Sequence, residues 1–182
     1  LDEEFPAEWM EQHARMKAKL MGFINPSRVT WSYDERDQSI AANYARAVAH
    51  YRENRIDEAL EAINGLIAQE PNNPYFHELK GQMLVDFGRV TQAIAPYEKA
   101  LSLAPQSGLI RTALAHAQIE TANSQGQEQN ARLLKDAIEN LKRAHQDEPR
   151  STRVHRLLAT AYGRQGQDAF ARLHLGEEAL LQ

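Results

Sequence analysis

Apolar and polar residues alternate along the chain with the three-to-four-residue spacing of amphipathic helices. The opening segment shows the pattern well, with an apolar stripe made of Trp9, Met16, Leu20 and Phe23 and with Met10 and Met21 beside it. The pattern predicts helices at residues 6–23, 40–53, 56–69, 74–87, 90–103, 107–123, 130–146, 151–164 and 167–181. Pro96 lies inside one of them, where it removes a hydrogen bond and is expected to bend the helix.

A repeat of 34 residues organises the chain after residue 40. Pro71 and Pro105 each follow a helical run and are 34 residues apart, and Pro149 follows after one period plus ten residues. Aligned on these prolines, one position in each first helix and one in each second helix always hold a small residue. They are Ala47, Gly81, Ala115 and Ala159 in the first helices, and Ala59, Ala93, Ala137 and Ala171 in the second. Small residues let helices approach closely, so the pattern predicts packed helix pairs.

Other positions of the alignment agree with this prediction. One large apolar position holds Ile63, Tyr97, Leu141 and Leu175, and another apolar position holds Leu66, Ala100 and Ala144 but fails at Glu178. The turn between the two helices carries Asn54, Gly88 or Gly166, which tolerate left-handed backbone. A single helix pair cannot bury its apolar face, so several pairs must pack on one another.

These units resemble the tetratricopeptide repeat (TPR) family, most specifically in the stretch PYFHELKGQMLVDFGRVTQAIAPYEKALSLAP. The resemblance implies an all-α fold, a right-handed TPR superhelix of about four helix pairs preceded by an N-terminal helix. We divide the chain into residues 1–39, an amphipathic helix and linker, and a TPR domain over residues 40–182. The units of that domain are 40–73, 74–107, 108–151 with a ten-residue insertion, and 152–182.

Two segments outside the repeat pattern leave alternatives open. The polar insertion near residues 124–129 is either a tolerated surface loop or a partner-specific contact, with one or both neighbouring helices extended. Trp31 and Tyr33 in the linker are expected to be buried against the first repeat, or else to be exposed for a neighbouring domain. The opening helix either caps the repeats or connects to a preceding domain. Because the chain begins at Leu1, we expect it to be part of a longer protein.

Composition excludes several functional classes. Apolar residues make up 42% and charged residues 25% of the chain, as in folded globular proteins. The formal net charge of −4 argues against binding to nucleic acid or an anionic membrane, because such binders carry a basic excess. The absence of cysteine excludes disulfides, thiolate metal sites and a thiol nucleophile. No apolar run approaches the ~20 residues that cross a bilayer.

The sequence predicts no catalytic residues, no metal ligands and no cofactor. No two of the seven histidines are four residues apart, so no helix offers a ready zinc pair. His77-Glu78-Leu79-Lys80-Gly81 comes nearest to the H-E-x-x-H zinc motif, but its fifth residue is a glycine that the repeat packing requires. Neither a phosphate-binding glycine loop nor a G-x-S-x-G nucleophile motif is present.

In TPR proteins, the first helix of each pair lines a concave groove, and this predicts the partner-binding residues. They are Tyr44, Val48, Tyr51, Arg52, Tyr75, Glu78, Gln82, Val85, Asp86, Thr112, His116, Ile119, Arg153 and Arg156. Such a surface begins aromatic and apolar, becomes acidic and ends with arginines, including Arg164. Aromatic and arginine side chains commonly anchor protein interfaces, so we expect a protein or peptide segment with an apolar portion and an acidic end. The alternative is that these residues only keep the repeats soluble.

Four stretches resemble a narrower group, the C-terminal region of BepA-like zinc metalloproteases, which are related to HtpX. They are HARMKAKLMGF (residues 13–23), NYARAVAHYR (residues 43–52), NNPYFHELKGQ (residues 72–82) and LLATAYGRQG (residues 157–166). The resemblance implies a preceding peptidase domain that binds zinc, a periplasmic location, and docking of substrates or outer-membrane assembly proteins by the TPR region. No catalytic residue of that family falls on this chain. The alternatives are a stand-alone scaffold of envelope or secretion assembly, or an enzyme with an unrecognised site.

Overall fold

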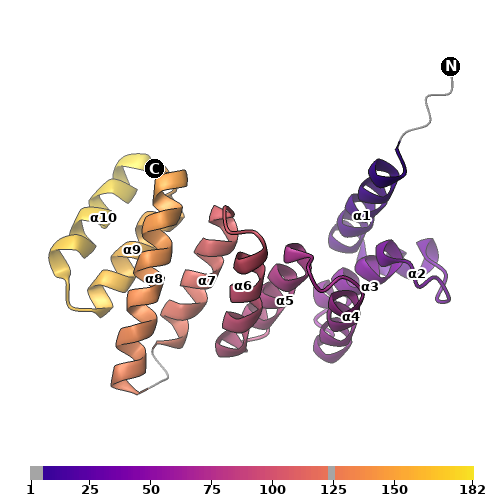
Figure 1. Ribbon diagram of the computed structural model, residues 1–182, viewed down its shortest axis with the longest axis horizontal. Coiled ribbons are helices and arrows are strands. Elements are labelled where there is room, and N and C mark those ends of the chain that lie inside the picture. The colour runs from indigo at the N-terminus through magenta and orange to yellow at the C-terminus, as the bar shows by residue number, and fades with distance from the viewer. Residues whose placement is uncertain (1–5, 123–125) are drawn as a thin grey trace. The chain divides into compact units, whose positions relative to one another are not determined.

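The structure is a computed structural model that describes residues 6–122 and 126–182, and in this part of the chain helices are joined by short turns (Figure 1). The chain divides into two compact units, residues 1–76 and residues 77–182. No helix in the described ranges combines the length and the apolarity needed to cross a membrane.

In the first unit, α3 packs against both α1 and α4. The elements are α1 (Ala7–Ile24), the 3-10 turn η1 (Pro26–Arg28), α2 (Val29–Ser32), α3 (Ile40–Arg52), α4 (Ile56–Gln69) and the beginning of α5 (Pro74–Asp86). The hydrophobic pattern predicted the long helices to within one residue at each end. It missed η1 and α2, because segments of three and four residues are too short to show a helical period.

In the second unit, each helix packs on the next one along the chain from α6 onward. These helices are α6 (Val90–Leu103), α7 (Gly108–Thr121), α8 (Gln127–Asp147), α9 (Thr152–Arg164) and α10 (Asp168–Leu181). The ten-residue insertion lengthens α8 to 21 residues, so the expected helix extension is confirmed there. Ser124 and Gln125 of the insertion lie outside the described residues. α6 continues as a helix through Pro96.

The small residues of the repeat lie where the helices meet. All eight of them are buried, from Ala47 and Ala59 in the first unit to Ala159 and Ala171 in the last repeat. Gly81 shows the reason most directly, because a methyl group added there would lie 2.7 Å from the ring of Tyr97. Tyr97 is the largest residue at its repeat position, so its partner helix can carry only hydrogen at the facing site.

The turns inside the repeats adopt the backbone that the sequence predicts. Gly88 and Gly166 both have φ of 73°, and Asn54 in the first repeat has φ of 58°. In these three pairs, the left-handed conformation ends the first helix and sends the chain back along it.

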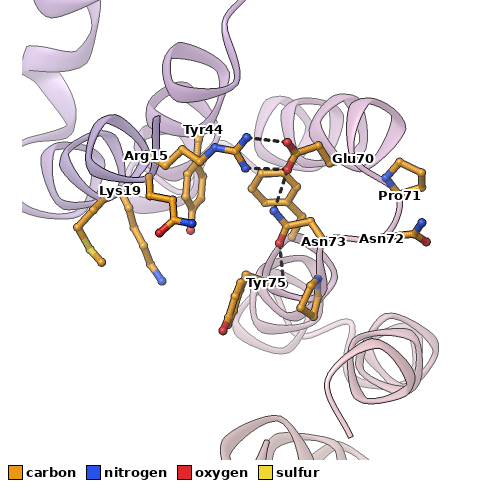
Figure 2. A pocket seen from close by; sticks show the side chains of 12 residues that line it. Arg15, Lys19, Tyr44, Glu70, Pro71, Asn72, Asn73 and Tyr75 are labelled. Atoms are coloured by element: carbon orange, nitrogen blue, oxygen red, sulfur yellow. Dashed lines mark hydrogen bonds and ion pairs between the residues drawn. The ribbon is translucent and has the colours of Figure 1, made fainter. Parts of the chain in front are cut away.

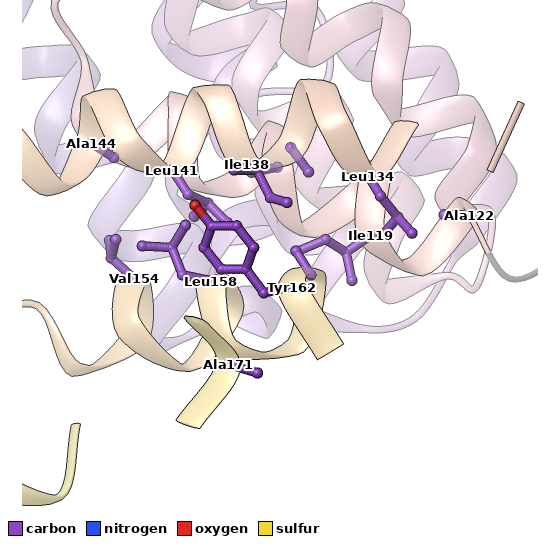
Figure 3. Packing of buried hydrophobic residues seen from close by; sticks show 13 residues of the cluster. Ile119, Ala122, Leu134, Ile138, Leu141, Ala144, Val154, Leu158, Tyr162 and Ala171 are labelled. Atoms are coloured by element: carbon purple, nitrogen blue, oxygen red, sulfur yellow. The ribbon is translucent and has the colours of Figure 1, made fainter. Parts of the chain in front are cut away.

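A large buried cluster of the second unit draws on α7, α8, α9 and α10 (Figure 3). Leu141 and Ile119 are completely buried in it, and Leu158 and Tyr162 pack beside them from α9. Every helix of this part of the unit therefore contributes to a shared core, as expected for repeats that cannot fold singly.

Two positions of the last repeat depart from the pattern. Leu175 occupies the large apolar position, but it is 52% exposed, because no helix among the described residues covers that face of α10. Glu178 stands at a normally apolar position and is nevertheless buried, because Arg156 of α9 binds its carboxylate. An ion pair thus replaces the apolar contact of the other repeats.

The expectation that Trp31 is buried against the first repeat was wrong, since its side chain is 90% exposed. Tyr33 does pack beside Val29, Ala45 and Ala49. Burial, together with the charge of Asp37, raises the pKa of Tyr33. Trp31 lies within the short helix α2, whereas Tyr33 follows that helix in extended backbone and packs beside residues of α3.

Candidate functional site

A cavity of about 910 Å³ lies in the first unit, between α1 and the turn that leads into α5 (Figure 2). Its walls come from α1, from Tyr44 of α3, from the turn after α4 and from the first residues of α5. The lining residues are Gln12, Arg15, Met16, Lys19, Tyr44, Glu70, Pro71, Asn72, Asn73, Pro74, Tyr75 and Phe76. We call this cavity the α1–α5 pocket.

Helix α1 reaches this position through its small residues. Ala18 and Gly22 are its buried residues, and a methyl group on Gly22 would lie 2.7 Å from Cβ of Val48 in α3. Because α1 packs through this small face, most of its apolar stripe faces solvent. Trp9, Met16 and Leu20 are between 50% and 63% exposed. An exposed row of large apolar side chains is a common mark of an interaction surface.

An ion pair fixes the turn at the back of the α1–α5 pocket to α1. Arg15 donates two hydrogen bonds to the Glu70 carboxylate, at 2.8 and 2.6 Å, and also contacts Glu11. The bond from Arg15, aided by a 2.9 Å bond from the Asn73 amide, lowers the pKa of Glu70 despite its partial burial. The Asn73 side chain in turn accepts a 3.1 Å bond from the backbone N–H of Tyr75, at the start of α5.

Aromatic rings give the α1–α5 pocket an apolar floor and rim. Tyr44 and Phe76 pack edge to face, with ring centroids 5.4 Å apart, and both are buried. Tyr75 and Met16 stand on opposite walls and are about 60% exposed. Lys19 adds a positive charge, and it has no ion-pair partner within the described residues. The pocket can therefore take an apolar side chain and a nearby acidic group.

Some of the predicted groove residues are largely or completely buried. Val48 and Ile119 are completely buried, and Tyr44 and Thr112 are less than 8% exposed. A partner cannot contact the first two unless the helices separate, because these side chains fill the core between helices. The prediction was too broad here, since a first-helix position can face the core as well as the surface.

The other predicted residues are exposed or half-buried, and their binding role stays a prediction. They are Tyr51, Arg52, Tyr75, Glu78, Gln82, Val85, Asp86, His116, Arg153 and Arg156. Tyr75 lies at the α1–α5 pocket together with the buried Tyr44. Met16 and Lys19 were missed, because the groove positions were taken only from the repeats, and α1 lies outside them.

Two of the three predicted arginines already have acidic partners in the second unit. Arg156 donates a 2.7 Å hydrogen bond from Nε to Glu178. Arg164 lies 3.6 Å from the Glu120 carboxylate and also donates to the carbonyl of Ile119. Arg153 is exposed on the same helix. The three arginines therefore offer less positive charge to an acidic partner than the sequence predicted. Arg156 also has a structural contact, because it binds the buried Glu178.

Reversing the charge of Arg156 should therefore lower the free energy of unfolding. A residue that only faced solvent would show little change. In Arg156→Glu, the buried carboxylate of Glu178 loses its cation and faces a like charge, which is expected to cost about 1 kcal/mol of unfolding free energy, since the arginine itself is largely exposed. Arg153→Glu is the matched control on α9 and should change stability by less than about 0.5 kcal/mol. Urea denaturation followed by circular dichroism measures both, and equal stabilities of the two variants would contradict this role.

Comparison with known proteins agrees with the repeat assignment. Residues 44–108 match the family model described as tetratricopeptide repeat. This stretch of the chain is therefore similar to tetratricopeptide repeats. A search of curated proteins found no match for the sequence.

Several solved structures are similar to the chain along nearly its whole length. MamA of strain AMB-1 has a TM-score of 0.72 at 18% sequence identity, covering 96% of this chain and 92% of that one. MamA from Desulfovibrio magneticus RS-1 has a TM-score of 0.73 at 15% identity, covering 94% of both chains. YrrB, a TPR protein with an unusual peptide-binding site, has a TM-score of 0.71 at 14% identity, covering 93% of this chain and 84% of its own. At such identities the likeness shows the fold, an all-α TPR solenoid.

Proposed function

We propose that this TPR chain is a protein-interaction module and that the α1–α5 pocket binds a peptide or protein segment. The proposal rests on one observation: an open cavity of about 910 Å³ has exposed apolar side chains on both of its walls. Side chains such as Met16 and Tyr75 are costly to leave in water and are favourable to cover. The likeness to YrrB, a TPR protein with an unusual peptide-binding site, supports a peptide ligand.

The chemistry of the α1–α5 pocket favours one kind of segment. The Tyr44–Phe76 floor and Met16 suit a buried apolar side chain, whereas Lys19 suits a carboxylate one or two residues away from it. Arg15 is less suited to bind that carboxylate, because Glu70 and Glu11 already occupy its guanidinium. We therefore expect an extended segment in which an apolar residue lies next to an acidic one.

Peptide display against the purified chain tests this function. Selection should enrich segments that pair an apolar residue with Asp or Glu. Met16→Glu and Tyr75→Glu should each weaken binding of a selected peptide at least tenfold, about 1.4 kcal/mol, because each places a carboxylate where the apolar side chain would lie. Fluorescence anisotropy with a labelled peptide measures the change.

Leu180→Glu provides the control for added charge at an exposed apolar site. Leu180 lies on α10, is 87% exposed and does not line the pocket, so this variant should bind the peptide like the parent chain. If all three variants bind equally well, the pocket is not the binding site. If selection enriches no sequence at all, the proposed peptide ligand is wrong.

A narrower role, as the docking region of a periplasmic zinc metallopeptidase in outer-membrane protein quality control, rests on the sequence stretches that resemble BepA-like proteins. In that role zinc and the catalytic residues would belong to a separate peptidase domain. A stand-alone scaffold or adaptor fits the TPR neighbours equally well. The gene separates the two, because an upstream signal sequence and an H-E-x-x-H motif in the same reading frame would favour the peptidase, whereas a start codon just before Leu1 would favour the scaffold.

A further inference from the structure

Three histidines and a glutamate gather where α8, α9 and α10 meet, at the end of the second unit. His155 of α9 presents Nδ1 at 3.1 Å from Nδ1 of His174 and at 3.0 Å from a carboxylate oxygen of Glu177, both on α10. His174 Nδ1 and the same glutamate oxygen are 3.7 Å apart. His145, near the end of α8, lies beside them, with its ring centroid 4.9 Å from that of His155.

The protonation of His155 follows from its other ring nitrogen. Nε2 lies 3.0 Å from the backbone carbonyl of Pro149, which can only accept a hydrogen bond. Nε2 therefore carries a proton, and in the neutral ring Nδ1 holds a lone pair directed at His174 and Glu177. A backbone carbonyl that binds the distal N–H of a histidine is also the usual support of a metal-binding imidazole, because it fixes the tautomer and the ring orientation.

Protons alone satisfy this arrangement poorly. If the His174 ring donates to Nδ1 of His155, that lone pair is used, and the glutamate oxygen at 3.0 Å faces it as a second acceptor. If His155 instead carries a proton on Nδ1, this single N–H faces two acceptors, the Glu177 oxygen at 3.0 Å and His174 Nδ1 at 3.1 Å, and must be shared between them. A divalent cation between the three atoms accepts all three lone pairs at once.

The spacing of the three atoms suits a small tetrahedral ion. With metal–ligand bonds of about 2.0–2.1 Å, the ligand atoms of a tetrahedral zinc site lie about 3.3 Å apart. The three separations here, 3.0, 3.1 and 3.7 Å, bracket that value. Two imidazoles and one carboxylate form a ligand set that favours zinc over magnesium or calcium.

The surroundings hold the ligands in place and leave a way in. Tyr162 stacks parallel on the His174 ring at 5.8 Å between centroids, which restricts its rotation. The side chain of Glu177 is 43% exposed, so an ion can enter from solvent on that side. Nδ1 of His145 is also buried, and it has no hydrogen-bond partner among the described residues.

We propose that His155, His174 and Glu177 bind a single divalent transition-metal ion of the zinc class. The ion joins α10 to α9 by direct bonds, and the fourth ligand position of its tetrahedron remains for water or a nearby side chain. Because Leu175 of α10 is 52% exposed, such a bond would add to the apolar contacts that hold α10 against α9. The site is separate from the α1–α5 pocket, so it stands or falls independently of the proposed peptide binding.

Calorimetric titration of the tag-free 182-residue chain with zinc sulfate tests the site. We expect one zinc ion per chain, no binding of Mg²⁺, and a zinc-dependent rise of the melting temperature, because the ion binds the folded state. Glu177→Gln keeps the size of the side chain but removes its charge, and it should weaken zinc binding at least tenfold. His174→Gln should abolish saturable binding.

His13→Gln is the matched control, because His13 is an exposed histidine on α1 and its loss should leave zinc affinity unchanged. Circular dichroism verifies that each variant keeps its helix content. Absence of saturable zinc binding by the parent chain would overturn the proposal. So would unchanged zinc affinity in folded Glu177→Gln and His174→Gln, since the ion would then be bound elsewhere.

Discussion

Replacing Leu141 with alanine is expected to lower the free energy of unfolding of the second unit by about 2–5 kcal/mol. Leu141 lies on α8, is completely buried, and contacts the shared cluster of α7, α9 and α10 (Figure 3). Shortening it removes apolar contacts and leaves a cavity that the surrounding helices cannot fill without moving. Urea denaturation followed by far-ultraviolet circular dichroism measures the loss.

Leu175→Ala is the control that makes this result specific. Leu175 occupies the same repeat position one unit later, yet it is 52% exposed, so its loss should cost less than about 1 kcal/mol. Equal costs at the two positions would mean that a further helix or a second chain covers α10 in solution. A small cost at both positions would mean that α8 does not pack as the structure shows.

Gly81→Ala is expected to destabilise the chain by about 1–3 kcal/mol, although alanine favours helices over glycine. The added methyl group would lie 2.7 Å from the Tyr97 ring, and its three nearest atoms all belong to that ring. A buried aromatic ring cannot move aside without disturbing its own neighbours, so α5 and α6 must separate. Thermal or urea unfolding monitors the change.

Two comparisons separate this packing effect from helix propensity. Gly65→Ala on α4 meets no atom within 4 Å and should stabilise the chain by about 0.5–1 kcal/mol, the opposite sign. In the Tyr97→Leu background, Gly81→Ala should lose most of its penalty, because the other repeats pair alanine at this site with leucine or isoleucine. A penalty that persists in that background would show that the glycine is needed for another reason.

The repeat could be predicted from the sequence because the residue type at each repeat position depends on contacts within a helix pair or with the next pair. Ala59 and Ala137 are small since a neighbouring helix touches them, and this requirement recurs in every pair. The turn residues Asn54 and Gly88 are similarly dictated by their own backbone angles. Such constraints act within a few tens of residues, so a single chain displays them several times.

The candidate sites could not be predicted in the same way. The α1–α5 pocket depends on which face of α1 packs on α3, and the sequence favoured the large residues, whereas Ala18 and Gly22 make the contact. In the metal cluster, His174 and Glu177 are three residues apart, but His155 comes from the preceding helix. A search for two histidines four residues apart cannot find a site that packing assembles from two helices. The same limit applied to Glu178, whose partner Arg156 is 22 residues away.

The central claim is that this chain binds a peptide through the α1–α5 pocket, and nuclear magnetic resonance tests it most directly. A labelled chain titrated with a selected apolar–acidic peptide should show its largest amide shift changes in α1, near Met16 and Lys19, and at the start of α5, near Tyr75. Shift changes confined to α7–α10, with α1 and Tyr75 unaffected, would contradict the claim.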